Sequence, residues 1–279
     1  MLPTRDQIER AAYDRWIRRH RAHGYDRHDW IGAENELTYL LNYQVAAEYA
    51  LDSSNPPSLG GRVHCRFCER TPSRTSFSLA RPVVQGVPGT TLFSAQICDE
   101  CHEDCRDPIA SHCENFWKTV HASGDPLDVV QGPDFDVLAV FKSLVASALL
   151  IMPEDELAYF ADTLEWVNNP DHEYDGGLFA DTYCHLYHLP SSPDRPWISL
   201  ARRVDDEAPF PYMISFVSWG RIVLQTALPL CIRDQDLDGR SARIPWRSLI
   251  AGEGPSFHEA ARTTLPLDSP RRKVRSGIR

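Results

Sequence analysis

Two Cys-x-x-Cys pairs constrain this chain more than any other feature of its sequence. Cys65 and Cys68 stand in "CRFC", Cys98 and Cys101 stand in "CDEC", and residues 69–97 separate the pairs. A Cys-x-x-Cys turn places two thiolates on one side of the backbone, and two such turns supply the four sulfur ligands that tetrahedral Zn²⁺ prefers. We therefore predict that these four cysteines bind a structural zinc. Buried reduced thiols and a redox dithiol are the alternatives, and no β-α-β pattern surrounds either pair to favour the dithiol.

The segment around the cysteines predicts a compact zinc domain over residues 62–121. The interval between the pairs is longer than in a usual zinc ribbon, so it must contain a hairpin or a loop. The residues after Cys101 have helical spacing through Ile109, Cys113, Phe116 and Val120. A cysteine turn, a hairpin and a second cysteine turn that opens a helix describe a treble clef.

Residues 1–51 predict a helical hairpin. Apolar residues recur at helical spacing in residues 5–23 and again in 27–51, and Gly24 interrupts the pattern as a C-cap. The strings "IERAAYDRW", "HG" and "DWIGAENEL" resemble a short helical domain of unknown function found in many bacterial proteins. That resemblance implies a bacterial origin and no particular activity.

Residues 137–260 predict a mixed α+β domain. Residues 137–151 form an apolar helical pattern, and a second helix begins after Pro153 with acidic residues in its first turn. Beyond Pro170 the runs "TYCHLYHL", "PWISLARRV" and "YMISFVSWGRIVLQTAL" are typical of strands. Residues 261–279 complete the chain as a basic tail. The expected fold class is therefore α+β: an N-terminal helical hairpin, a zinc-bound treble clef and a C-terminal mixed helix and strand domain.

The cysteine segment also resembles the Cys₄ branch of the HNH endonucleases. "CRFC", Pro82, the turn "QGVPGTT" and "CDECH" fall in the order of that family's pattern. In the family, the zinc braces a ββα hairpin that binds a separate catalytic metal, and a histidine activates water. That histidine should lie near residues 78–80, but residues 69–97 contain no histidine and only one acid, Glu69. The resemblance therefore implies the zinc frame and not the hydrolytic site.

Two functions follow from this pattern. The first is a degenerate, zinc-stabilised treble clef that binds nucleic acid or a protein partner without catalysis. The alternative is a divergent HNH-type nuclease that hydrolyses DNA with a second divalent metal. It would use His102 or His112 as its catalytic histidine, with Asp99 or Glu103 beside it. A second metal on the helix after Cys101 would draw on Cys105 and Cys113, although buried thiols are the commoner role for such cysteines.

The charge of the chain limits how it can contact nucleic acid. The formal net charge is −10 at pH 7, so any contact with phosphate needs a local basic patch. Arg15, Arg18 and Arg19 on the first predicted helix, together with the basic tail, are the candidates for that patch. The first residues lack the apolar core of a signal peptide and no apolar run is long enough to span a bilayer, so we expect a cytoplasmic protein without membrane contact.

Overall fold

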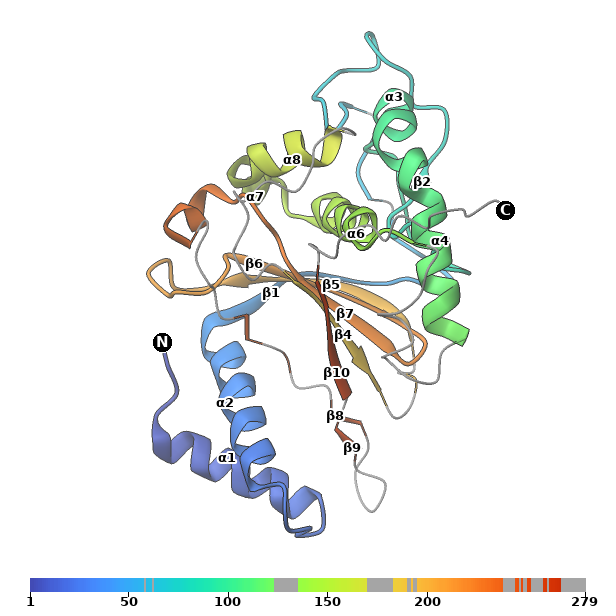
Figure 1. Cartoon of the computed structure of the whole chain (residues 1–279). Helices are drawn as coiled ribbons and strands as arrows, with labels where there is room; N and C mark the ends of the chain where they lie inside the picture. Colours follow the sequence, from blue (N-terminus) through green and yellow to red (C-terminus); the bar gives the residue numbers. More distant parts are fainter. Residues whose placement is uncertain are drawn as a thin grey trace, which may run out of the picture.

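The computed structural model shows one six-stranded antiparallel sheet with helices on both sides (Figure 1). It describes residues 1–57, 59–61, 63–122, 135–169, 183–189, 192, 195–237, 244–245 and 247, and the backbone of strands at 250–251, 258–259 and 261–266. The strand order is β1-β5-β6-β7-β4-β10. The strands are β1 (Tyr43–Ala50), β4 (Tyr183–His188), β5 (Trp197–Arg203), β6 (Met213–Trp219), β7 (Ile222–Ala227) and β10 (Ala261–Pro266).

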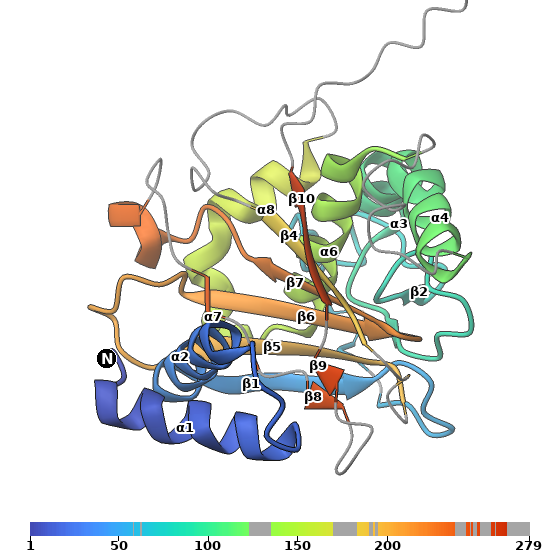
Figure 2. The ribbon, with the colours of Figure 1, turned by 60° about the horizontal axis from the view of Figure 1, so that its bottom comes forward.

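The sheet carries a separate apolar core on each face because successive side chains of a strand point to opposite sides. On β6, Val217 packs in the larger core with α6 (Val137–Ile151) and the cysteine segment, while Phe216 packs on the other face with Tyr39. Burial on both faces explains why β6 and β7 consist mostly of apolar residues. Figures 1 and 2 show α4, α6 and α8 on one side of the sheet and the N-terminal helices on the other.

Helix α6 is the central helix of the larger core and confirms the prediction for residues 137–151. The side chain of Asp136 caps it by accepting a hydrogen bond from the Leu138 N–H at 2.9 Å. Every residue from Ala139 to Ile151 is buried. The helix prediction after Pro153 is also confirmed, as α7 (Glu154–Leu157), a 3-10 turn (Ala158–Phe160) and α8 (Ala161–Asn168).

The cysteine segment contains little regular structure before its helix. Strands β2 (Arg81–Pro82) and β3 (Phe93–Ser94) form a two-residue antiparallel ladder between the cysteine pairs. The second pair opens α3 (Asp99–Cys101), which continues through a π-helix (His102–Arg106) into α4 (Asp107–Ala122). The buried side chains of this segment belong to the same apolar core as α6 and the sheet. The division of the chain at 62–121 and 137–260 into separate domains stays a prediction.

Three predicted elements differ in the structure. The N-terminal hairpin is confirmed as α1 (Arg5–Arg18) and α2 (Asp26–Asn42), but the second helix does not reach residue 51, because residues 43–50 pair with β5 as strand β1. The first helix ends at Arg18 rather than at 23. Residues 261–266 were expected in a basic tail and instead form β10, which pairs with β4. Strands β8 (Ile250–Ala251) and β9 (His258–Glu259) make a small separate ladder.

A buried ion pair fixes one end of the sheet. Arg203 at the end of β5 donates to Asp234 at 3.0 Å, and both side chains are almost completely buried. The second carboxylate oxygen of Asp234 accepts the backbone N–H of Tyr212 at 2.7 Å. Asp234 therefore ties the 3-10 helix Ile232–Leu237 to the strands β5 and β6.

Candidate metal centre

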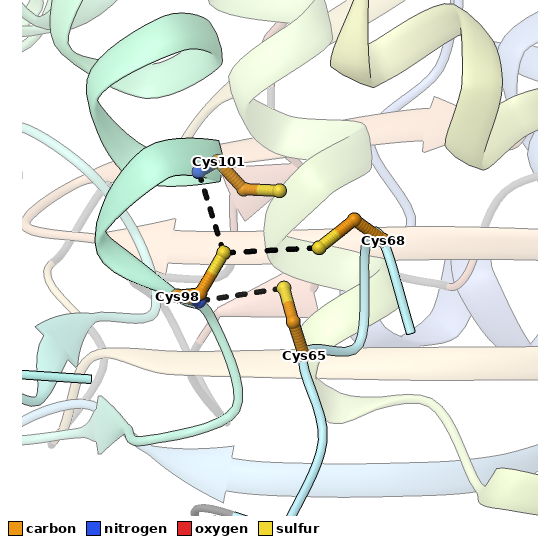
Figure 3. A group of neighbouring side chains, drawn as sticks. All are labelled: Cys65, Cys68, Cys98 and Cys101. Atoms are coloured by element: carbon orange, nitrogen blue, oxygen red, sulfur yellow. Dashed lines mark hydrogen bonds between the residues drawn. The ribbon is translucent and has the colours of Figure 1, made fainter. Parts of the chain in front are cut away.

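The four predicted cysteines meet at one point of the structure (Figure 3). Their sulfur atoms all lie within 4.8 Å of one another, and the Cys68 and Cys98 sulfurs are 3.8 Å apart. A tetrahedral cage with Zn–S bonds of about 2.3 Å requires sulfurs about 3.8 Å apart. The group therefore has the size and the donor set to hold a metal ion, and its four thiol ligands fit zinc.

Backbone hydrogen bonds shape the first cysteine turn. The Cys65 N–H donates to the Arg70 carbonyl at 2.7 Å, and the Glu69 N–H donates to the Cys65 carbonyl at 2.8 Å. Glu69 has a left-handed φ of 58°, which reverses the chain directly after Cys68. The turn thus holds both sulfurs of the pair on the side that faces the second pair.

The second cysteine turn is the N-terminus of a helix. Cys98 is the N-cap of α3, where its sulfur accepts the Cys101 N–H at 3.5 Å and its carbonyl accepts the His102 N–H at 3.1 Å. The Cys98 N–H also donates to the sulfur of Cys65 at 3.3 Å, so a backbone bond joins the two pairs. Amide donors aimed at sulfur favour thiolate, which is the form that binds a metal.

The thiols of this group differ in acidity because of where the donors lie. The pKa of Cys65 is lowered to about 4 because the Cys101 thiol and the N–H groups of Cys98, Phe67 and Cys68 donate to its sulfur. Burial raises the pKa of Cys68 to about 11, and the Cys65 sulfur together with burial raises that of Cys101. Four adjacent thiolates repel one another in a buried site, so the fully deprotonated group needs a cation among its sulfurs.

Contacts to α6 and α8 hold the first cysteine turn against the rest of the molecule. The Arg66 guanidinium donates to the Met152 carbonyl, where α6 ends, and lies 3.6 Å from a carboxylate oxygen of Glu154. The Asn168 amide donates to the Phe67 carbonyl at 2.7 Å. No pattern in the sequence distinguishes these supporting residues, because their partners are backbone carbonyls far along the chain.

Each candidate catalytic histidine has a partner within the protein. His102 is 7% exposed, and its Nδ1 lies 3.0 Å from a carboxylate oxygen of Asp107. Burial lowers the pKa of His102. Nδ1 of His112 accepts the Asp136 N–H at 3.0 Å. His112 therefore accepts a backbone N–H next to α6, and His102 is buried beside the carboxylate of Asp107.

The candidate acids do not gather into a second metal site. The Asp99 carboxylate accepts the Ser78 N–H at 3.0 Å and the Ser78 hydroxyl at 2.9 Å, while Glu103 is exposed. Hydrogen bonds from Ser76 and Ser78 lower the pKa of Asp99. Across the residues that the structure describes, only the four-cysteine group brings three or more potential His, Cys, Asp or Glu ligands together.

The remaining cysteines of the helix lie outside the four-cysteine group. The Cys105 thiol donates to the Asn168 carbonyl at 2.9 Å, and burial raises its pKa to about 11. Cys113 is 1% exposed within the core side of α4. The structure thus places both thiols in packing roles, and the metal suggested for them is not supported.

The basic patch predicted on the first helix is only partly exposed. Arg15 is 3% exposed, donates to Glu36 at 2.9 Å and lies directly against Gly32 on α2. Arg19 forms an ion pair with Asp29 and stacks over the Tyr25 ring at 4.5 Å. These two arginines join α1 to α2, so Arg18 is the one member of the predicted set that faces solvent. Residues 267–279 of the basic tail lie outside the described residues.

Comparison with known proteins finds a match for one segment of the chain. A family model described as "Protein of unknown function (DUF2934)" matches residues 3–38, the segment for which the sequence predicted a short helical domain without assigned activity. No curated protein and no solved structure matches this chain. Within the described residues, none of the helices has the length and apolarity needed to cross a membrane.

Proposed function

We propose that Cys65, Cys68, Cys98 and Cys101 bind one structural zinc ion and that the protein is a non-hydrolytic binding protein built around it. The observation that carries the proposal is the meeting of four sulfurs at tetrahedral spacing inside an apolar core. A bound zinc would supply a four-thiolate centre that leaves no position for water, so it would act as a scaffold. The segment would then present a surface for nucleic acid or for a protein partner.

The order of elements supports a treble clef of the HNH type. A cysteine turn is followed by the short β2–β3 ladder, and the second cysteine turn opens α3 and the helix after it. The same order led to the resemblance with the Cys₄ branch of the HNH endonucleases. The matched family model covers only the N-terminal helices, so the treble clef rests on this geometry alone.

The surroundings of the hairpin favour binding over hydrolysis. Near residues 78–80, where the resemblance places the nuclease histidine, this chain has Ser-Leu-Ala, and the N–H and hydroxyl of Ser78 donate to Asp99. His102 is buried beside Asp107, and His112 accepts the Asp136 N–H. A nuclease needs an imidazole near water and oxygen ligands for a second divalent ion. The alternative of a divergent nuclease therefore has no arrangement of described residues in its favour.

Two measurements on the purified protein test the proposal. Elemental analysis should find one zinc per chain. Incubation with supercoiled plasmid and Mg²⁺, Mn²⁺ or Zn²⁺ should leave the plasmid intact. Protein without zinc would refute the structural centre, and cleavage that is lost in His102→Ala or His112→Ala would refute the non-hydrolytic role.

A further inference from the structure

The turn between α1 and α2 is a concentrated basic surface on an acidic protein. Arg18, His20, Arg21, His23 and Arg27 are all exposed there, and we call these five residues the basic turn. Within residues 18–28 the one acidic side chain is Asp26, whereas the whole chain carries a net charge of −10. The turn lies at the opposite end of the molecule from the cysteine segment (Figure 1). The positive potential of this turn would therefore attract a polyanion, although the protein as a whole is negatively charged.

The backbone of the turn takes a conformation that glycine would adopt more easily. His20 and Arg21 have left-handed φ values of 54° and 61°, and their N–H groups donate to the Ile17 and Trp16 carbonyls, both at 2.9 Å. Residues with a Cβ are disfavoured in this region, and glycine is not. The chain nevertheless has a histidine and an arginine at these positions, and both residues are exposed.

Aromatic rings and internal contacts hold the turn in place. The Arg21 guanidinium lies 5.9 Å from the Trp16 ring centre, and the His23 ring lies 5.8 Å from the same ring. Arg19 lies over one face of Tyr25, whose residue is still 53% exposed. Guanidinium groups suit phosphates because they donate in a planar fork, and exposed aromatic rings beside them suit unpaired bases.

We propose that the basic turn binds the backbone of single-stranded nucleic acid, with Arg18, Arg21 and Arg27 at phosphates and Tyr25 stacked against a base. The inference rests on the proposed non-hydrolytic binding role and supplies its partner and its surface. The basic turn takes the place of the basic patch expected on the first helix, because Arg15 and Arg19 form ion pairs with residues of α2. Three phosphate contacts to a single strand predict a slope of about −2 for log K against log salt concentration.

The test measures binding of the full chain to a fluorescent oligothymidylate of about 30 nucleotides by anisotropy, over salt from about 50 to 200 mM. Arg18→Ala/Arg21→Ala/Arg27→Ala should weaken binding at low salt by roughly tenfold or more and bring the slope close to zero. The matched control is Arg5→Ala/Arg10→Ala/Arg74→Ala, which removes the same charge from exposed arginines elsewhere. The control should stay within about threefold of wild type. Equal losses in the two triple variants would overturn the assignment.

A single variant separates binding from folding. Arg21→Gly should keep or raise the thermal midpoint, because glycine relieves the left-handed backbone, while it weakens binding about threefold to tenfold. Wild-type affinity in this variant would overturn the role of Arg21. Affinities for polyglutamate and for anionic vesicles are measured in the same way. If the protein binds either of them as tightly as the oligonucleotide, nucleic acid is refuted as the partner. Tyr25→Ala should reduce the preference for single strand over duplex.

Zinc content measured on the same samples keeps this inference distinct from the proposed metal centre. All variants of the turn should retain one zinc per chain. Oligonucleotide binding by protein that lacks zinc would refute the metal centre and leave the basic turn supported. Zinc-loaded protein that binds no oligonucleotide would refute the basic turn and leave the metal centre intact.

Discussion

Replacement of Cys98 by serine should uncouple the cysteine segment from the rest of the fold. Cys98 has no exposed surface, its sulfur accepts the Cys101 N–H, and that sulfur lies 3.8 Å from the sulfur of Cys68. Serine keeps the size of the side chain but removes the thiolate, so the remaining three ligands no longer close the cage. The second cysteine turn would also exchange its sulfur acceptor for a shorter hydroxyl.

The expected magnitude is large compared with the stability of a domain. Structural zinc contributes about 10–16 kcal/mol of apparent binding free energy in finger peptides. A whole domain is stable by only about 5–15 kcal/mol. Between residues 63 and 101 the backbone has only the two-residue β2–β3 ladder and the three-residue helix α3, so little regular structure would remain to hold it. The six-stranded sheet contains no residue of this interval and should persist.

The assay combines zinc content with hydrogen exchange followed by mass spectrometry. Cys98→Ser should bind little zinc and lose amide protection across residues 63–101, while β5 and β6 stay protected. The matched control is Cys184→Ser, since Cys184 is also a buried cysteine, 1% exposed, but lies in β4. Burying that hydroxyl should cost about 1–3 kcal/mol and leave zinc content unchanged. One zinc per chain with full protection in Cys98→Ser would refute the reasoning.

Two further predictions concern stability and are measured by urea unfolding. Asp234→Asn should cost about 3–5 kcal/mol because it leaves the charge of the buried Arg203 without a carboxylate. Asp206→Asn should cost less than about 1 kcal/mol, because Asp206 is exposed and its partner Arg233 is only half-buried. Similar losses in the two variants would contradict this reasoning. Gly32→Ala should destabilise the protein, although alanine is favoured over glycine in a helix by about 1 kcal/mol. An added Cβ would clash with the buried guanidinium of Arg15, and in an Arg15→Ala background the same change should become stabilising.

The parts of the structure that the sequence predicted correctly are those set by local pattern. The two cysteine pairs share a fixed spacing that leaves few arrangements, and the structure brings all four sulfurs together. Residues 137–151 are apolar except for Lys142, Ser143 and Ser147, which predicts a buried helix, and they form one. The run at 213–227 has Gly220 and Arg221 in its middle, and it forms the hairpin of β6 and β7 around the left-handed Gly220.

The parts that differ depend on partners distant in the sequence. "YQVAAEYA" contains good helix formers, yet its pairing with β5 makes it a strand, with an irregular register between Val45 and Ala47. Arg15 was expected on a solvated face because arginine is rarely buried. In the structure, the absence of a side chain at Gly32 leaves space for the Arg15 guanidinium, and the carboxylate of Glu36 accepts its hydrogen bond. Neither feature is visible in the periodicity of α1 alone.

The pairing of β1 with β5 has a consequence for synthesis of the chain. Ala50 pairs with Trp197, so β1 has no strand to pair with until residues 197–203 have been translated. At ordinary elongation rates that interval lasts roughly 7–30 s. The cysteines at 65–101 emerge within it, and the segment can acquire its metal before the sheet exists. A nascent chain of this protein would therefore carry an unpaired β1 for many seconds, and an unpaired strand edge is exposed to aggregation during that time.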